Sequence, residues 1–180
     1  QHDFQSGKIR TLETLTETDK YTAYLIEYPS DGLTITGVMQ IPKGEGPFPV
    51  IVMNHGFYAR SVFTSGDGTD RSSAFLAEHG YITLASDYRS WGGSDVGESL
   101  FYSGLAIDVI NLLNAIPSIP QADATRVGMW GHSMGGGVTM KVLAVIGDFD
   151  ALTALRSAQR VKAAVLYSSV SADHADVIAR

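Results

Sequence analysis

One stretch indicates the fold of this chain most strongly: Arg126-Val127-Gly128-Met129-Trp130-Gly131-His132-Ser133-Met134-Gly135-Gly136-Gly137. It contains a short apolar strand, a turn rich in glycine and the start of an apolar helix, with Ser133 at the centre of a G-x-S-x-G pentapeptide. When a strand enters such a turn and a helix leaves it, the serine stands on a strained, exposed corner. Both flanks fit this pattern, so Ser133 is the candidate nucleophile.

Outward from this stretch, predicted strands alternate with predicted helices. The expected strands are continuous apolar runs at 50–53, 81–86, 127–130 and 163–167, as in strands buried on both faces. The expected helices are 71–79, stopped by Gly80, an apolar stripe over 105–116 ended by Pro117, and the apolar run 140–146. Alternation at these lengths predicts a mainly parallel central sheet with helices on both faces.

The N-terminal part predicts a different local structure. Tyr21–Tyr28 and Leu33–Ile41 are rich in β-branched and aromatic residues, and the turn sequence Pro29-Ser30-Asp31-Gly32 separates them. This pattern predicts an antiparallel hairpin. Residues 1–20 are polar and rich in Thr and Glu, which predicts an N-terminal arm or irregular edge. Residues 21–180 are then expected to be the N-terminal part of a single domain.

Composition narrows the class of protein. The chain has 180 residues, 44% of them hydrophobic and 18% charged, as in ordinary globular proteins. A net charge of −6 argues against a nucleic-acid or anionic-membrane partner, and we expect no apolar run close to the ~20 residues of a membrane span. Without cysteine, a thiolate nucleophile and a disulfide framework are excluded. None of this decides between a secreted, periplasmic or cytoplasmic location.

Polar residues at the carboxyl ends of the predicted strands supply the chemistry. Attack by Ser133 on an acyl carbon builds negative charge on the carbonyl oxygen, which two backbone N–H groups can stabilise. One predicted donor is Met134, which follows the nucleophile at the start of a helix. The other is Phe57 in the loop His55-Gly56-Phe57, where Gly56 lets the backbone approach closely.

Four motifs, from about Tyr21 to Ser171, resemble the α/β-hydrolase superfamily in its prolyl-oligopeptidase-like and dienelactone-hydrolase-like serine esterase branch. They are the hairpin ending in Asp31-Gly32, Asn54-His55-Gly56-Phe57, Asp87-Tyr88-Arg89 with Gly92-Gly93-Ser94, and Asp123-Ala124-Thr125-Arg126-Val127 leading into Gly131–Gly136. The resemblance implies an α/β-hydrolase fold with a serine nucleophile and no cofactor. The five histidines show no ligand-like spacing with carboxylates, so no metal site is expected.

The same resemblance implies that half of the catalytic machinery lies elsewhere. In this family the acid and then the histidine follow later strands, in the order Ser, Asp, His. We therefore expect the C-terminal strands of the fold to be absent from this chain, and a further segment beyond Arg180 to supply the acid and the histidine. Asp173 is an alternative acid within the chain, and His174 an alternative base.

The expected function is that of a serine carboxylesterase acting on small-molecule esters through an acyl-enzyme on Ser133. A peptidase, a cutinase-like polyester hydrolase and a non-catalytic binding protein or fragment of the same fold remain alternatives. Around Ser133, we expect His132 to pack beside the turn and His55 to shape its loop. Asp87 and Arg89 are expected to pin their loop by hydrogen bonds. Phe57, Tyr58 and Trp91 either line an acyl pocket or pack internally.

Overall fold

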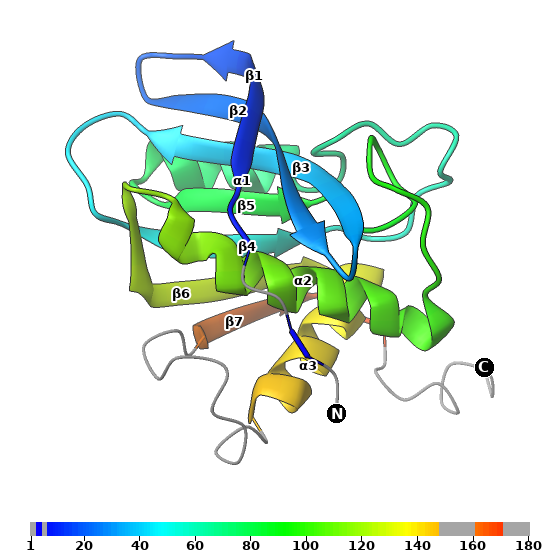
Figure 1. Cartoon of the computed structure of the whole chain (residues 1–180). Coiled ribbons are helices and arrows are strands. Elements are labelled where there is room, and N and C mark those ends of the chain that lie inside the picture. Colours follow the sequence, from blue (N-terminus) through cyan, green and yellow to red (C-terminus); the bar gives the residue numbers. More distant parts are fainter. Residues whose placement is uncertain (1–2, 5–6, 148–160, 171–180) are drawn as a thin grey trace.

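The computed structural model describes residues 3–4, 7–147 and 161–170 and shows a seven-stranded sheet in the order β1-β2-β3-β5-β4-β6-β7 (Figure 1). The strands are β1 (Arg10–Glu17), β2 (Tyr21–Ser30), β3 (Leu33–Pro42), β4 (Phe48–Asn54), β5 (Ile82–Ser86), β6 (Ala122–His132) and β7 (Val161–Tyr167). The helices are α1 (Asp70–Glu78), α2 (Ser103–Ala115) and α3 (Met134–Gly147), with single 3₁₀ turns η1 (Leu100–Tyr102) and η2 (Ile116–Ser118) on either side of α2.

The predicted parallel sheet is present as β5, β4, β6 and β7, which pair in parallel. Its centre is buried, since Val50, Val52 and Leu84 are completely inaccessible. Helix α1 covers one face of the sheet, and α2 and α3 cover the other (Figure 1). The register aligns Asn54, the last residue of β4, with Gly131 of β6. The loops that follow these two strands therefore begin side by side.

The N-terminal hairpin is also confirmed, with a tighter turn than expected. Strands β2 and β3 pair in register up to Ser30 and Leu33, so only Asp31 and Gly32 form the loop. Both residues have positive φ angles, 53° and 77°. A two-residue hairpin turn of this kind matches the twist of its strands and favours Asp-Gly.

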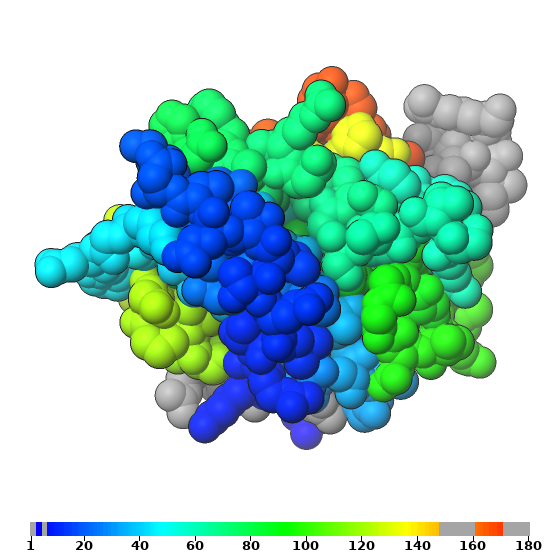
Figure 2. All heavy atoms as spheres, turned by 90° about the horizontal axis from the view of Figure 1, so that it is seen from above, coloured from blue at the N-terminus to red at the C-terminus, as the bar shows by residue number. Residues whose placement is uncertain are grey.

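The expected irregular arm at residues 1–20 contains a regular strand. Strand β1, at Arg10–Glu17, pairs antiparallel with β2, and every one of its eight residues is exposed. The molecule viewed from above shows these N-terminal strands, in blue, on the near face (Figure 2). Since backbone pairing rather than burial holds β1, its sequence carries no apolar face that could have predicted it.

Helix α2 is the core helix of the described part of the chain. Leu105, Val109 and Leu112 on its apolar stripe are completely buried. The expectation that no apolar run is close to the length of a membrane span was wrong. Leu100–Ser118 has 19 residues and a hydropathy of 1.4, and by length and composition it could cross a membrane. Of that run 61% is buried inside the protein, as in the core helix of a globular fold.

Strand β7 differs from its prediction as a buried strand. Val165, Leu166 and Tyr167 are 57%, 44% and 60% exposed, on both faces of the strand. The second half of α3, expected to be buried all round, also exposes Met140 and Val145. Both elements lie at the last edge of the described sheet, so in the described part of the chain no strand or helix covers their outer sides.

Candidate active site

Ser133 occupies a sharp corner between the end of β6 and the start of α3. Its φ angle of +53° lies in the left-handed region, which costs a residue with a side chain roughly 1–2 kcal/mol. The main chain is held there on both sides. Its N–H donates to the carbonyl of Tyr167 at 3.1 Å, and its own carbonyl accepts from Val170 N–H at 3.1 Å. The end of β7 therefore stabilises the strained conformation.

The two glycines of the pentapeptide allow the elements to cross closely. A Cβ on Gly131 would lie 2.5 Å from the carbonyl oxygen of Gly135. A Cβ on Gly135 would lie 2.5 Å from the carbonyl oxygen of His55 and closer still to that of Asn54. The first turn of α3 therefore packs directly against the end of β4, and only glycine fits at either position.

We expect Gly135→Ala to destabilise the fold by about 1–3 kcal/mol, because the new methyl group meets fixed backbone atoms. Gly147→Ala, at the other end of the same helix, is the matched control. A Cβ there meets nothing within 4 Å, and alanine is the better helix former. Urea unfolding measures both. Equal midpoints for the two variants would contradict the packing described here.

The predicted oxyanion loop lies against the candidate nucleophile. A Cβ on Gly56 would lie 3.3 Å from Ser133 Cβ and 3.4 Å from His132 Nδ1. Phe57, the next residue, has a side chain that is 69% exposed, whereas Met134 on the other side of Ser133 is only 2% exposed. The structure thus places Gly56, the neighbour of Phe57, directly against Ser133, the neighbour of Met134. The roles of the Phe57 and Met134 N–H groups stay predictions.

His55 is placed to shape this loop rather than to act as a base. Its ring lies between Phe63 and Tyr88, at centroid distances of 4.6 and 4.4 Å. Its Nδ1 is 2.6 Å from the carbonyl oxygen of Gly56, and its Nε2 is 3.2 Å from that of Asp87. Burial lowers the pKa of His55, and both ring nitrogens face backbone carbonyls.

Aromatic side chains border the loop. Phe57 stands edge-on to Trp91, with ring centroids 6.4 Å apart. Trp91 itself is buried and donates its indole N–H to the carbonyl of Tyr58 at 3.0 Å, while Arg60 lies 4.8 Å over its ring. Of the aromatic residues named as pocket candidates, Trp91 therefore packs internally and holds the loop, whereas the ring of Phe57 is exposed.

His132 and Tyr167 form a second aromatic pair beside Ser133. Their rings stack with centroids 5.3 Å apart, which places His132 beside the turn as predicted. His79, at the end of α1, contacts the carbonyl of Phe75. Among the described residues no hydrogen bond joins Ser133 Oγ to a histidine. The alternatives Asp173 and His174 lie outside the described residues.

Asp87 pins its loop, as predicted. Its Oδ2 accepts hydrogen bonds from Thr36 Oγ1 at 2.6 Å and from Ser65 Oγ. The side chain is completely buried, and burial raises the pKa of Asp87 to about 6 against the opposing effect of these hydrogen bonds.

Arg89 pins the loop through a partner that the sequence analysis missed. Its Nη2 donates to Asp108 Oδ1 on α2 at 2.8 Å, and its backbone N–H donates to Oδ2 of the same carboxylate at 2.9 Å. Burial by itself would lower the pKa of Arg89, but the carboxylates of Asp108 and Asp31 together more than compensate, so the pKa is raised. The available signal was an Asp inside the apolar run of α2, on the face that the stripe buries.

Comparison with known proteins identifies a family that this chain matches. A family model described as "Esterase FrsA-like" matches residues 8–173. Esterase FrsA of Shigella boydii serotype 18 and of Escherichia coli K12 are each 32% identical over 111 residues, which is 62% of this chain and 25% of each relative. The chain thus spans about a quarter of the length of the curated relatives it matches.

Solved structures agree on the fold. The rice cell wall degrading esterase LipA from Xanthomonas oryzae has a TM-score of 0.64 at 22% identity, over 87% of this chain and 48% of LipA. An acetyl xylan esterase from Paenibacillus sp. R4 has a TM-score of 0.61 at 22% identity, over 77% of this chain and 49% of that enzyme. At such identities the likeness shows the α/β-hydrolase fold alone. The family model, which matches residues 8–173, shows more than the fold. This chain belongs to the FrsA-like esterase family.

Proposed function

We propose that this chain is the nucleophile-bearing part of a serine hydrolase that cleaves carboxylic esters through an acyl-enzyme on Ser133. The observation that carries the proposal is the conformation of Ser133, strained at φ +53° and held between β6, α3 and the end of β7. Strain that the surroundings maintain in this way is typical of functional sites. Membership of an esterase family favours esters over peptide bonds.

In the proposed mechanism, Ser133 Oγ attacks the carbonyl carbon of the ester. The carbonyl oxygen becomes an oxyanion, which the N–H groups of Phe57 and Met134 stabilise, and loss of one such donor typically costs ~10²–10³ in rate. The C–O bond to the alcohol then breaks and leaves an acyl group on Ser133. A water molecule hydrolyses this acyl-enzyme. A histidine takes and returns the proton at each step.

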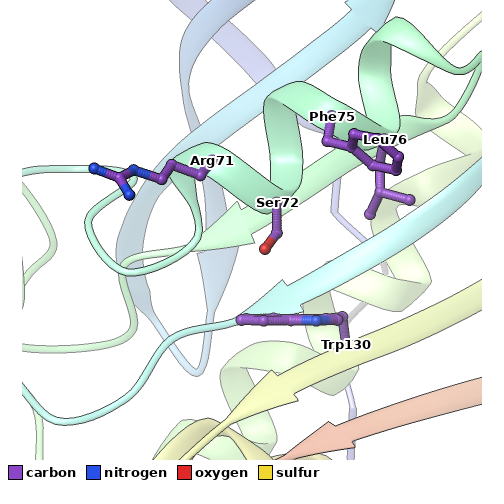
Figure 3. A pocket seen from close by; sticks show the side chains of 5 residues that line it. All are labelled: Arg71, Ser72, Phe75, Leu76 and Trp130. Atoms are coloured by element: carbon purple, nitrogen blue, oxygen red, sulfur yellow. The ribbon is translucent and has the colours of Figure 1, made fainter.

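We further propose that a C-terminal segment of the same polypeptide supplies this histidine and the acid. Two surfaces of the described chain support the proposal. The apolar strand β7 is exposed on both faces. Beside it, between α1 and β6, lies a hollow of about 310 Å³ lined by Arg71, Ser72, Phe75, Leu76 and Trp130 (Figure 3). Further strands pairing with β7 would extend the sheet, and the helices that connect them would cover both surfaces.

The test is to label the full-length polypeptide with a fluorophosphonate probe, which reacts with activated serines, and to assay it with p-nitrophenyl acetate. We expect ester turnover and an adduct that peptide mass spectrometry locates at Ser133. As a control, Ser61→Ala, which removes an exposed serine of the neighbouring loop, should label normally. A folded protein that hydrolyses neither this ester nor a peptide and takes no label would favour the non-catalytic binding alternative.

A further inference from the structure

Asp87 is connected to both ends of the oxyanion loop, defined here as residues 55–58, at one end through its backbone carbonyl and at the other through its carboxyl group. The first connection runs through the backbone. The carbonyl oxygen of Asp87 faces Nε2 of His55, whose Nδ1 faces the carbonyl of Gly56. A shift of the Asp87 backbone would therefore move the His55 ring and the glycine that lies against Ser133.

The second connection runs through the side chain. Gly92 packs so closely on Asp87 that a Cβ at this glycine would overlap the carboxylate oxygen Oδ2. Gly92 directly follows Trp91, whose indole N–H holds the carbonyl of Tyr58 at 3.0 Å and whose ring borders Phe57. The position of the carboxylate is thus transmitted to the far end of the same loop.

The carboxylate is itself fixed from two other elements. Thr36 on β3 and Ser65, in the loop before α1, both donate to Oδ2, and the Gly66 N–H adds a third hydrogen bond. The other oxygen, Oδ1, is buried without a hydrogen-bond partner among the described residues. The two hydroxyl donors on Oδ2 come from different elements and fix the orientation of the carboxyl group.

We propose that Asp87 is a positioning residue for the oxyanion loop and holds this loop against Ser133. The inference rests on the proposed function only for its effect on catalysis. Asp87 makes no contact with Ser133 among the described residues and acts through His55, Gly92 and Trp91.

The surroundings of Asp87 set the pH range. Burial raises its pKa to about 6, and the charge of Asp67 in the loop before α1 raises it as well. His55, at the end of β4, faces Asp87 through its backbone carbonyl, and burial lowers the pKa of this histidine. Tyr28 on β2 stays neutral near pH 7, because burial raises its pKa well above the usual value. Asp87 should therefore change its ionisation state near pH 6 and be ionised above that pH, and the ring of Trp91 should report this change.

The experiment compares the full-length protein with Asp87→Asn, which keeps an oxygen acceptor for Thr36 and Ser65 but cannot ionise. The protein is labelled with 5-fluorotryptophan, and the Trp91 resonance is assigned from a Trp91→Phe variant. We expect the ¹⁹F shift of Trp91 to titrate with a midpoint near pH 6 in the parent. In Asp87→Asn it should stay at the low-pH position throughout.

Catalysis provides the second readout. At pH 7.5, Asp87→Asn should lower kcat by about 10–100-fold, the cost of a small misplacement of catalytic groups, with a smaller change in KM. The matched control is Asp95→Asn, which removes another carboxylate of the same loop and should leave the titration intact.

The two proposals fail in different ways. A titration of Trp91 that persists in Asp87→Asn would assign the transition to another group, such as His55, and overturn the positioning role. A protein without esterase activity in which the Trp91 titration still depends on Asp87 would overturn the proposed function alone.

Discussion

Replacing Ser133 by alanine in the full-length polypeptide should lower kcat for p-nitrophenyl acetate by at least about 10⁴-fold, because the acyl-enzyme can no longer form. The remaining steps depend on backbone groups and on a histidine that alanine does not disturb. KM should change little. The measurement is a comparison of initial rates at matched protein concentration, with Ser61→Ala as the variant that retains full activity.

The backbone at Ser133 makes a second variant informative. Ser133→Gly also removes the hydroxyl, but glycine adopts φ +53° without steric cost. We therefore expect Ser133→Gly to be about 1 kcal/mol more stable than Ser133→Ala, although both are inactive. Urea unfolding separates the two. Equal stability would show that the corner is not strained, and residual turnover in both would show that Ser133 is not the nucleophile.

Much of the central sheet could be predicted from local sequence, because burial and turn chemistry leave local patterns. Strand β4 is a continuous apolar run, and the positive φ angles at Asp31 and Gly32 match the Asp-Gly turn of the hairpin. The approach of Gly56 to Ser133 followed from two loops at the carboxyl ends of adjacent parallel strands. The glycines in these motifs carried the prediction, because Gly32 adopts the positive φ angle of the turn and Gly56 allows the close approach to Ser133.

The features that could not be predicted depend on partners far along the chain. Strand β1 is held mainly by backbone pairing with β2 and is exposed at every residue, its two leucines included. The exposure of β7 depends on what lies beside it rather than on its own apolar sequence. The pairing of Arg89 with Asp108 joins a loop to a helix 19 residues away. The apolar periodicity of α2 places Asp108 on the buried face of the helix, but nothing local identifies Arg89 as the residue that neutralises its charge.

That ion pair is where a single substitution should destabilise the fold most. Asp108 is completely buried and accepts hydrogen bonds from the Arg89 backbone and guanidinium and from Ser30 Oγ at 2.6 Å. Asp108→Ala would leave the guanidinium, whose side chain is 8% exposed, with the Glu98 carbonyl at 3.1 Å and, as its one described carboxylate, the more distant Asp31 at 3.5 Å. Removing one partner of a buried pair typically costs 3–5 kcal/mol, so we expect a loss of about that size.

Urea unfolding of Asp108→Ala, monitored by circular dichroism at neutral pH, measures this loss. Asp19→Ala is the control, because it removes a carboxylate from an exposed pair with Lys20 at 3.8 Å and should leave the midpoint nearly unchanged. The double variant Arg89→Met, Asp108→Leu tests the cause. It should lose less stability than the sum of the single variants, because no unpaired charge stays buried. Additive losses would mean that packing, and not the ion pair, holds the loop that carries Asp87 and Trp91 against α2.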